Sequence, residues 1–362
     1  MCYLIYVAKR KKVLKLKPKK ENPGTEMASS SGITLSIPIL VSSAIALITV
    51  SFLIGYIVHP EINNAFQSLR LSNKYKYVNP LLACDTELEL ESDKTRQLTS
   101  QIQDYVSEAK SRGELNDASV YVRDYNGGYV VNYNPEGRYN QASLSKVVVM
   151  MKVLELAEKD PGFLSKTFTY TDLEDYNLGL EILPTKALVS GQQYTIEEAL
   201  RYMTEYSDNN ATFYLMSILD QGSYDNIYHD LKISPPSDEQ IENYLDFRTA
   251  KEYSYFFRVL YNATYLDREA SEKAIEYLTR SDFDDGLEAG VPEGVTVAHK
   301  FGILNHLVDN KPERELHDCG IIYKDNSKPY LACIMTKSFS ELGQQKKTIG
   351  DISALIFQEL RQ

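Results

Sequence analysis

Two residues near the middle of the chain have the types and the spacing of a nucleophile and its base. Ser143 and Lys146 stand three positions apart, immediately before the apolar run of residues 147–151. If this run is helical, one turn brings the lysine amine beside the serine hydroxyl. A serine hydroxyl is a weak nucleophile at neutral pH, and a desolvated lysine with a lowered pKa is able to take its proton. The pattern therefore predicts a serine nucleophile activated by a lysine base, provided that the helix is buried.

The Ser-x-x-Lys spacing alone does not establish a site. A second match, from Ser107 to Lys110, lies on a polar stretch, and a serine at the position of Ser143 could equally cap a helix. Ser145 offers another hydroxyl, but it adjoins the lysine and would face a different side of the helix. We therefore expect Ser143 to be the nucleophile, and the evidence for it must come from elsewhere in the chain.

Two further motifs follow in order. They are Ser207-Asp208-Asn209 and Lys300-Phe301-Gly302. Together with the first motif they resemble the S-x-x-K, S-D-N and K-T-G signatures of the class A serine β-lactamases and the penicillin-binding proteins. The resemblance covers roughly residues 92–362. It implies an α+β fold in which a five-stranded antiparallel sheet, built from both ends of the chain, packs beside a helical lobe.

The resemblance also implies a catalytic role for three residues. Ser143 would attack the carbonyl of a β-lactam or a cell-wall peptide and form an acyl-enzyme, and Lys146 would accept its proton. Desolvation and the nearby Lys300 would lower the pKa of Lys146. Ser207 would then relay a proton to the departing nitrogen.

The same resemblance implies a set of substrate-binding residues, which are Asn209, Lys300, Gly302 and Ile303. Asn209 would hold Lys146 and the amide of the substrate, while Lys300 on an edge strand would attract the substrate carboxylate. Gly302 would let a substrate lie along this strand as an additional strand. The backbone N–H groups of Ser143 and Ile303 would form the oxyanion hole.

Two features depart from the family pattern. Phe301 stands where the family has threonine or serine, so a hydroxyl that helps to bind the carboxylate is missing. The segment that would carry a deacylating glutamate is short and offers Glu239, four positions before Asn243, and Glu242. Either glutamate could activate the water, or neither could, because a solvated surface glutamate is the ordinary case. Slow hydrolysis and a trapped acyl-enzyme are therefore both open.

Hydrophobic periodicity and turn residues predict the elements that carry the motifs. Helices are expected over residues 92–112, 143–157, 195–206, 211–219, 249–261, 269–279 and 340–360. Strands are expected over residues 118–125, 129–133, 296–302, 316–323 and 329–337. Strands at both ends of this region enclose a run of helices. This order predicts a sheet lobe of residues 92–165 and 290–362 and an all-helical lobe of residues 166–289.

The N-terminal part of the chain predicts a membrane anchor. Residues 1–20 contain basic residues and no acidic ones, although the whole chain has a net charge of −11. Residues 33–58 contain no charged residue and could span a hydrocarbon core of about 30 Å. We expect residues 1–32 to be a cytoplasmic arm, residues 33–58 a single transmembrane helix and residues 59–91 a stalk. Residues 92–362 would then be extracytoplasmic.

Other readings of these segments have less support. A cleaved signal peptide is the alternative to the anchor, but no small-x-small cleavage site stands near residue 58. Nucleic-acid binding by the basic arm is not expected, because aromatic residues are not interleaved with its charges. The four cysteines are too few for a disulfide framework. Cys84, Cys319 and Cys333 would lie outside the cell, so at least one would be free or would pair between chains.

The histidines form no zinc-binding pattern, and we expect neither a metal nor another cofactor. A Ser-His-Asp hydrolase is disfavoured because the chain lacks a Gly-x-Ser-x-Gly elbow. The leading hypothesis is a membrane-anchored, extracytoplasmic serine β-lactamase-like hydrolase. Its alternatives are a penicillin-binding-type peptidase or transpeptidase, and a non-catalytic protein that keeps the fold and binds peptidoglycan or a partner.

Overall fold

The computed structural model describes residues 91–219, 221–234, 247–324 and 328–361, together with residues 70–71, 74–81 and a few positions between 38 and 51. The chain divides into two compact units, of which one holds residues 1–69 and 83–86 and the other residues 70–82 and 87–362. Most of the predicted span 33–58 lies outside the described residues. Residues 45–51, which are described, are helical. Among the described residues, no helix combines the length and the apolar character that crossing a bilayer requires.

The second unit contains helices and strands in mixed order. Its α-helices are α2 (Asp93–Ser111), α3 (Lys146–Lys159), α4 (Ile196–Glu205), α5 (Asn209–Ser217), α6 (Gln221–Asp230), α8 (Ala250–Tyr261), α9 (Arg268–Leu278) and α10 (Leu342–Leu360). Its 3-10 helices are η1 (Ala142–Ser145), η2 (Phe163–Ser165) and η3 (Glu288–Gly290). Its strands are β1 (Asp117–Asp124), β2 (Val130–Tyr133), β3 (Tyr139–Asn140), β4 (Thr167–Thr169), β5 (Gln193–Thr195), β6 (Phe247–Arg248), β7 (Thr296–Val308), β8 (Lys311–Tyr323) and β9 (Tyr330–Ser338).

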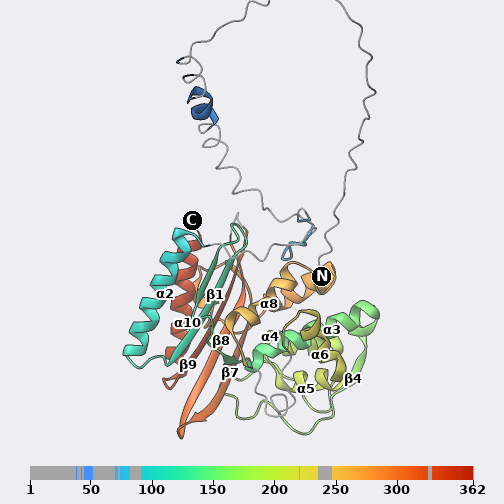
Figure 1. The fold of residues 1–362 in the computed structure, drawn as a ribbon. Coiled ribbons are helices and arrows are strands. Elements are labelled where there is room, and N and C mark those ends of the chain that lie inside the picture. The colour runs from blue at the N-terminus through green and yellow to red at the C-terminus, as the bar shows by residue number, and fades with distance from the viewer. Residues whose placement is uncertain are drawn as a thin grey trace, which may run out of the picture. The chain divides into compact units, whose positions relative to one another are not determined.

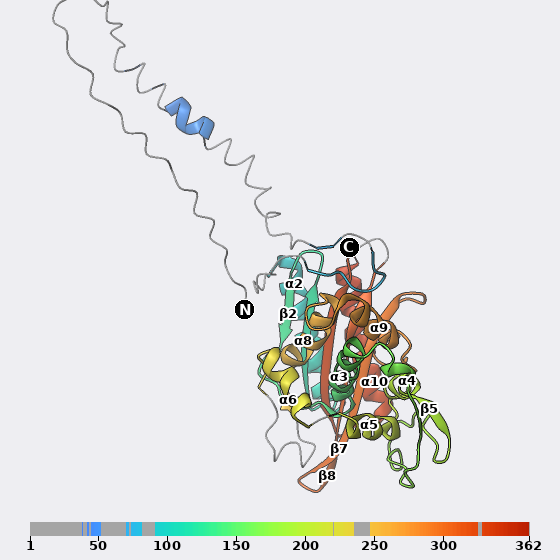
Figure 2. The ribbon, with the colours of Figure 1, turned by 90° about the vertical axis from the view of Figure 1, so that its right-hand side faces the viewer.

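The main sheet has five strands in the order β2-β1-β9-β8-β7, and every neighbouring pair is antiparallel. Strands from the beginning and the end of the unit meet where β1 pairs with β9. The predicted sheet, built from both ends of the chain, is therefore confirmed. Figure 1 shows α2 and α10 together on one face of this sheet, and Figure 2 shows the helical lobe on the other, with helices α3, α4, α5, α6, α8 and α9. The third motif lies on the edge strand β7.

The sheet separates two apolar cores, and successive side chains of β7 point alternately into one and the other. Val297 and Phe301 belong to the core under α2 and α10, while Ala298 belongs to the core under the helical lobe. Lys300, two residues after Ala298, shares its face. The alternation therefore places Lys300 on the side of the sheet where the nucleophile helix α3 packs.

Capping residues start several helices where the sequence predicts them. Ser92 accepts a hydrogen bond from the Thr95 N–H at the start of α2. Thr195 and Glu198 form a reciprocal capping box at α4. Each cap satisfies a backbone donor that the first helical turn leaves free, and so fixes where the helix begins.

The structure departs from the predicted elements in several places, and one of them is the short β3–β6 pair, which was not predicted. β7 continues to Val308 and turns into β8 through Asp309 and Asn310, whose φ angles are +50° and +61°. This tight hairpin was not predicted, because neither turn residue is glycine. The lobe predicted to be all-helical also contains the short β4–β5 pair. Helix α6 has no strong apolar period and was missed.

Part of the segment predicted to be a stalk packs on the folded unit. The carboxylate of Glu272 on α9 accepts hydrogen bonds from the backbone N–H groups of Lys76, Tyr77 and Val78. The Asn79 N–H donates to the Tyr261 carbonyl at 2.8 Å. The contacts of the folded unit therefore begin well before residue 92.

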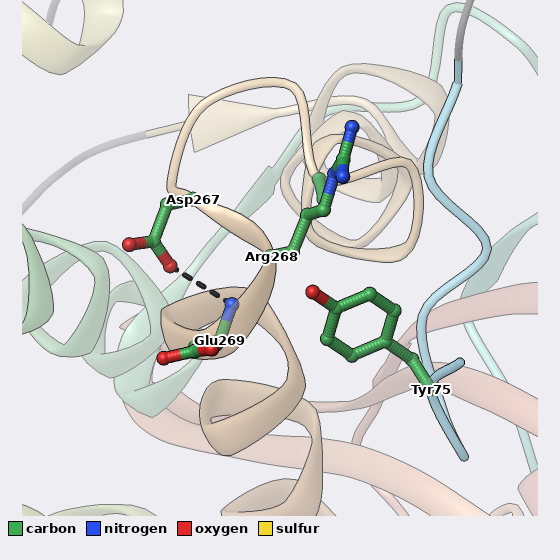
Figure 3. Close-up of a pocket in the computed structure, with 5 residues that line it drawn as sticks. Tyr75, Asp267, Arg268 and Glu269 are labelled. Carbon is green, nitrogen blue, oxygen red and sulfur yellow. Dashed lines mark hydrogen bonds between the residues drawn. The ribbon is translucent and has the colours of Figure 1, made fainter. Parts of the chain in front are cut away.

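A shallow pocket lies beside this docked segment. Its volume is about 340 Å³, and Figure 3 shows Tyr75 facing the N-terminus of α9 across it. The lining residues are Tyr75, Ala263, Asp267, Arg268 and Glu269. None of them belongs to the three motifs, and Asp267 is engaged in capping α9. The pocket is thus separate from the candidate site.

Cys319 and Cys333 form a disulfide between facing positions of β8 and β9. Both residues are fully buried on the face toward the helical lobe. Lys300 pairs with Cys319 in the β7–β8 register, so the disulfide lies beside the third motif on the same face of the sheet. Cys84, the remaining predicted extracytoplasmic cysteine, lies outside the described residues.

Candidate active site

Ser143 lies in a tight turn that precedes the nucleophile helix. The turn is the 3-10 helix η1, and the regular helix α3 begins only at Lys146. Ala142, the residue before Ser143, has a φ of +49°, in the left-handed region that residues with side chains rarely adopt. Ser143 is half-buried. The Ser145 hydroxyl, in contrast, donates to the Ala142 carbonyl at 2.8 Å, so it is engaged within the turn.

The amine of Lys146 points into the protein, as the predicted chemistry requires. Its side chain is 3% exposed. Nζ donates to the Ser207 carbonyl at 2.6 Å, to Ser207 Oγ at 3.1 Å and to Asn209 Oδ1 at 2.8 Å. Burial, followed by the charge of Lys300, holds the pKa of Lys146 well below its usual value, although Asp208 opposes this shift. In the described structure, the Lys146 N–H donates to the Ser143 carbonyl, but no hydrogen bond joins the Lys146 amine to the Ser143 hydroxyl.

Ser207 connects the first and third motifs. Its hydroxyl accepts from Lys146 Nζ at 3.1 Å and from Lys300 Nζ at 2.9 Å. Its φ of +58° is again in the left-handed region, and only 6% of the residue is exposed. Strained residues of this kind persist only where the surroundings fix them. Three distant parts of the chain therefore meet at one buried hydroxyl.

Lys300 is enclosed more completely than a surface anion-binding lysine would be. It is 1% exposed, and Nζ also donates to the Phe301 carbonyl at 3.1 Å. The Phe301 ring lies beneath the amine, with its centroid 4.1 Å from Nζ. Burial lowers the pKa of Lys300 to about 7, against the opposing charges of Asp318 and Asp282. Near neutral pH this amine therefore exists in both protonation states.

The second motif is positioned by Asn177, a residue that sequence reasoning missed. Asn177 Nδ2 donates to Asp208 Oδ1 at 2.7 Å, and Asn177 Oδ1 accepts from the Asn209 N–H at 2.9 Å. Asp208 is fully buried and caps α5 by accepting from the Asn210 and Ala211 N–H groups. Burial raises the pKa of Asp208 despite these hydrogen bonds. Asn177 lies in a loop without a recognisable motif, so no signal in a single sequence marks it.

Asn209 holds Lys146, as the resemblance implied. Its Oδ1 accepts from Lys146, while its Nδ2 donates to the Tyr176 carbonyl at 3.0 Å. One amide hydrogen is thus used within the protein, and the amide has a second hydrogen to offer. Contact between Asn209 and a substrate amide stays a prediction.

Gly302 is required for a reason that differs in part from the predicted one. A Cβ atom at this position would lie 2.7 Å from the Gln141 carbonyl oxygen and 3.0 Å from the Leu144 nitrogen. The close approach is therefore to the nucleophile turn of the same chain, which brings β7 against η1. Ile303 follows Gly302 on the edge strand and is half-buried. The oxyanion hole formed by the Ser143 and Ile303 N–H groups stays a prediction.

Phe301 fills the core behind the site. It is 3% exposed and stacks on Phe283, with ring centroids 4.3 Å apart. The residue that replaces the family's hydroxyl is therefore a packing residue that also lines the Lys300 amine. Glu239, Glu242 and Asn243 lie outside the described residues. Within the described part of the chain, no cluster of histidine, cysteine, aspartate and glutamate has the makings of a metal site.

The fold and the site together define the class of serine β-lactamases and penicillin-binding proteins. The structure of the extended-spectrum β-lactamase TLA-1 matches with a TM-score of 0.63 at 18% identity, covering 75% of this chain and 100% of that one. The structure of PBP-A matches with a TM-score of 0.59 at 18% identity, covering 75% and 97%. At these identities the likeness shows the fold alone.

Sequence comparison shows the family. Residues 97–360, well over half of the chain, match the family described as the β-lactamase enzyme family. The chain belongs to this family. Its similarity to Beta-lactamase 3 of Bacillus cereus extends over 268 residues at 25% identity, which is 70% of this chain and 80% of the relative.

Proposed function

We propose that the protein is a serine hydrolase that forms an acyl-enzyme on Ser143 with a β-lactam or a cell-wall peptide. The observation that carries this proposal is the convergence of Lys146 and Lys300 on the Ser207 hydroxyl, at 3.1 and 2.9 Å. The close approach of Gly302 to the turn that contains Ser143 places the edge strand beside the nucleophile. Family membership supports the same reaction.

The acylation step follows from these contacts. The lowered pKa of Lys146 favours its neutral form, which takes the proton of Ser143 as Oγ bonds to the substrate carbonyl carbon. When the carbon–nitrogen bond breaks, Ser207 gives its proton to the departing nitrogen and regains one from the Lys146 ammonium. The net result moves one proton from Ser143 to the nitrogen. The charged form of Lys300 attracts the substrate carboxylate.

Hydrolysis of the acyl-enzyme would then require an activated water. We propose Glu239 or Glu242 for this role, since both lie between the second and third motifs. If neither acts, the acyl-enzyme persists and the protein behaves as a penicillin-binding peptidase or transpeptidase. The fold that the chain shares with PBP-A is compatible with this second function. A structure of a PBP-A mutant bears penicillin G as an acyl-enzyme, and its TM-score to this chain is 0.58.

A covalent-labelling experiment tests the proposal. The protein is incubated with a fluorescent penicillin, weighed by mass spectrometry and digested to locate the label. We expect one adduct on Ser143, lost in Ser143→Ala and retained in Ser145→Ala, the matched control whose hydroxyl is engaged within the turn. An unlabelled wild-type protein would overturn the enzymatic proposal and favour the non-catalytic binding protein.

Turnover of nitrocefin separates the two enzymatic functions. A β-lactamase turns it over repeatedly, whereas a penicillin-binding-type enzyme gives one equivalent of product and stops. Loss of turnover in Glu239→Ala or Glu242→Ala, with acylation intact, would identify the residue that activates water. Retention of turnover in both variants would exclude both candidates.

We also propose that residues 33–58 anchor the protein in the membrane with the folded unit outside the cytoplasm. The uncharged stretch after a basic arm supports this orientation. The buried Cys319–Cys333 disulfide is typical of an oxidising compartment. Protease added to intact cells should digest the folded unit and leave the arm protected. Protection of the whole chain would contradict this topology.

A further inference from the structure

Two buried ionisable side chains bind the main chain just before the nucleophile and have no role in the reaction described above. Glu315 and His317 lie on β8 and are 1% and 0% exposed. The Asn140 N–H donates to Glu315 Oε2 at 2.8 Å, and the Asn140 carbonyl accepts from His317 Nε2 at 2.9 Å. Both main-chain groups of one residue are therefore held by side chains of a single strand.

The hydrogen bonds of His317 define its tautomer. The Thr336 N–H donates to His317 Nδ1 at 3.2 Å, so Nδ1 is an acceptor and the ring proton is on Nε2. This neutral form donates to the Asn140 carbonyl. Lys337 lies 3.5 Å from Glu315 Oε1, and His306 lies 3.9 Å from the same atom. Burial opposes the charge of Glu315, but His317, whose Nε2 lies 3.4 Å from Glu315 Oε2, together with Lys337 and the Asn140 N–H, lowers the pKa of Glu315.

From Asn140 the contacts continue to the nucleophile. Asn140 Oδ1 accepts from the Ala142 N–H at 2.9 Å. Ala142 is the residue in the left-handed region, and its conformation sets the direction in which the chain enters Ser143. Because a residue with a side chain is strained there, the surrounding contacts must maintain the turn. The Glu315 and His317 contacts with Asn140 are suited to this task.

His317 also lies behind the other wall of the site. It pairs with Gly302 in the β7–β8 register. Gly302 in turn packs on the Gln141 carbonyl, at the distance given above. His317 thus contacts the edge strand through its backbone and the residue before the nucleophile turn through its side chain.

We propose that Glu315 and His317 are positioning residues that orient Ser143 for attack by fixing the main chain at Asn140. The inference rests on the proposed acylation of Ser143. Loss of either contact would let the turn relax and would slow the chemical step, while the binding of substrate before acylation would change little. A displacement of about 1 Å at a reacting atom is enough to cost on the order of 100-fold in rate.

The test separates the acylation rate at saturating fluorescent penicillin from the dissociation constant of the non-covalent complex. Glu315→Leu and His317→Leu remove the contacts, whereas Glu315→Gln keeps an acceptor and His317→Gln keeps a donor. Leu316→Ala is the matched control, because Leu316 lies between them and packs in the opposite core. Thermal unfolding of every variant records the loss of stability.

We expect the two leucine variants to acylate at least about tenfold more slowly with a dissociation constant within about twofold of the wild type. The glutamine variants should recover most of the rate. Leu316→Ala should lose stability without this loss of rate. Leucine variants as fast as the wild type, or slowed no more than an equally destabilised Leu316→Ala, would overturn the inference. A wild-type protein that is never acylated would instead overturn the proposed function.

Discussion

Burial makes the two lysines of the site chemically suitable, because it destabilises their charged forms and lowers their pKa values. An ammonium group without a paired carboxylate is destabilised away from water, so its neutral form becomes accessible near neutral pH. Lys146 and Lys300 are both buried, and they share the Ser207 hydroxyl rather than a carboxylate. Proximity of like charges adds to the effect on Lys146. One amine can then act as a base while the other carries charge.

The first prediction concerns the pH dependence of acylation. Burial lowers the pKa of Lys300 to about 7, so the amine is charged below this pH and neutral above it. The second-order rate constant for acylation by a penicillin, which carries a carboxylate, should therefore fall as the pH rises through about 7. The pH dependence of this rate constant reflects the pKa of Lys300 in the free enzyme, in which no bound carboxylate stabilises the charged amine. Stopped-flow labelling between pH 5.5 and 9 measures it.

Lys300→Arg provides the control for this profile. An arginine stays charged throughout this range, so the alkaline fall should disappear even if the overall rate is lower. A fall at the same pH in Lys300→Arg would assign the titration to another group. A flat wild-type profile would contradict the prediction.

The second prediction concerns the residue that departs from the family motif. Phe301→Thr would restore a hydroxyl, but it would also remove a ring that stacks on Phe283 in the core. We expect the free energy of unfolding to fall by about 3 kcal/mol, as for other large-to-small changes in cores. Urea denaturation measures the loss. A change below about 1 kcal/mol would show that the core closes around the smaller side chain.

At the residue scale, the sequence predicted what family motifs encode and no more. Ser143, Lys146 and Ser207 were identified by short patterns whose order is informative. Asn177 and Asn140 were missed, because they act through main-chain hydrogen bonds that depend on the fold. The left-handed conformations of Ala142 and Ser207 were also not predictable, since neither residue type favours them.

At the scale of elements, the site depends on loops held to helix ends. The third prediction concerns Asn177, which bonds both the Asp208 side chain and the Asn209 backbone. Asn177→Ala should lower the free energy of unfolding by about 2 kcal/mol, since it removes the hydrogen bonds to the Asp208 carboxylate and from the Asn209 N–H. It should also slow acylation, because the second motif loses its support. Thermal unfolding and fluorescent-penicillin labelling measure the two effects.

Asn126→Ala is a suitable control for this variant, because Asn126 is exposed in the β1–β2 turn. It should leave both stability and acylation near the wild-type values. An Asn177→Ala protein that labels at the wild-type rate would show that α5 and its cap hold the second motif without the loop.

The elements themselves were predicted where side chains follow a clear period. The β1–β2 hairpin and the α4 capping box carry strong local signals, and both are present. The β7–β8 hairpin was missed because Asp309 and Asn310 replace the glycine that usually marks such a turn. The end of the strand that carries the third motif was therefore harder to predict than the motif itself.

At the scale of the whole folded unit, the sheet unites the two ends of the sequence that surround the helical lobe. This arrangement puts the nucleophile turn and the edge strand, which are separated by more than 150 residues in the chain, into direct contact. The order of predicted strands and helices was sufficient to infer it. It was not sufficient to show that residues 70–81 pack on the unit, since polar, mixed composition is also typical of a linker.

The fourth prediction concerns this docked segment. Three consecutive backbone N–H groups, of Lys76, Tyr77 and Val78, donate to the Glu272 carboxylate. Glu272→Ala removes their common acceptor, so hydrogen–deuterium exchange at residues 76–78 should accelerate by at least about tenfold, the equivalent of about 1.4 kcal/mol in local stability. Acylation should be unchanged, because none of these residues contacts the motifs.

Glu276→Ala is the control for this experiment, since Glu276 lies one turn later on α9 and pairs instead with Arg280. It should leave exchange at residues 76–78 at the wild-type rate. If Glu272→Ala exchanges as slowly as the control, the segment is held by its other contacts, which include the Asn79 and Leu81 N–H bonds to the carbonyls of Tyr261 and Asn262 at the end of α8. If both variants exchange fast, the segment depends on the helix as a whole. Only acceleration confined to Glu272→Ala assigns the docking to this carboxylate.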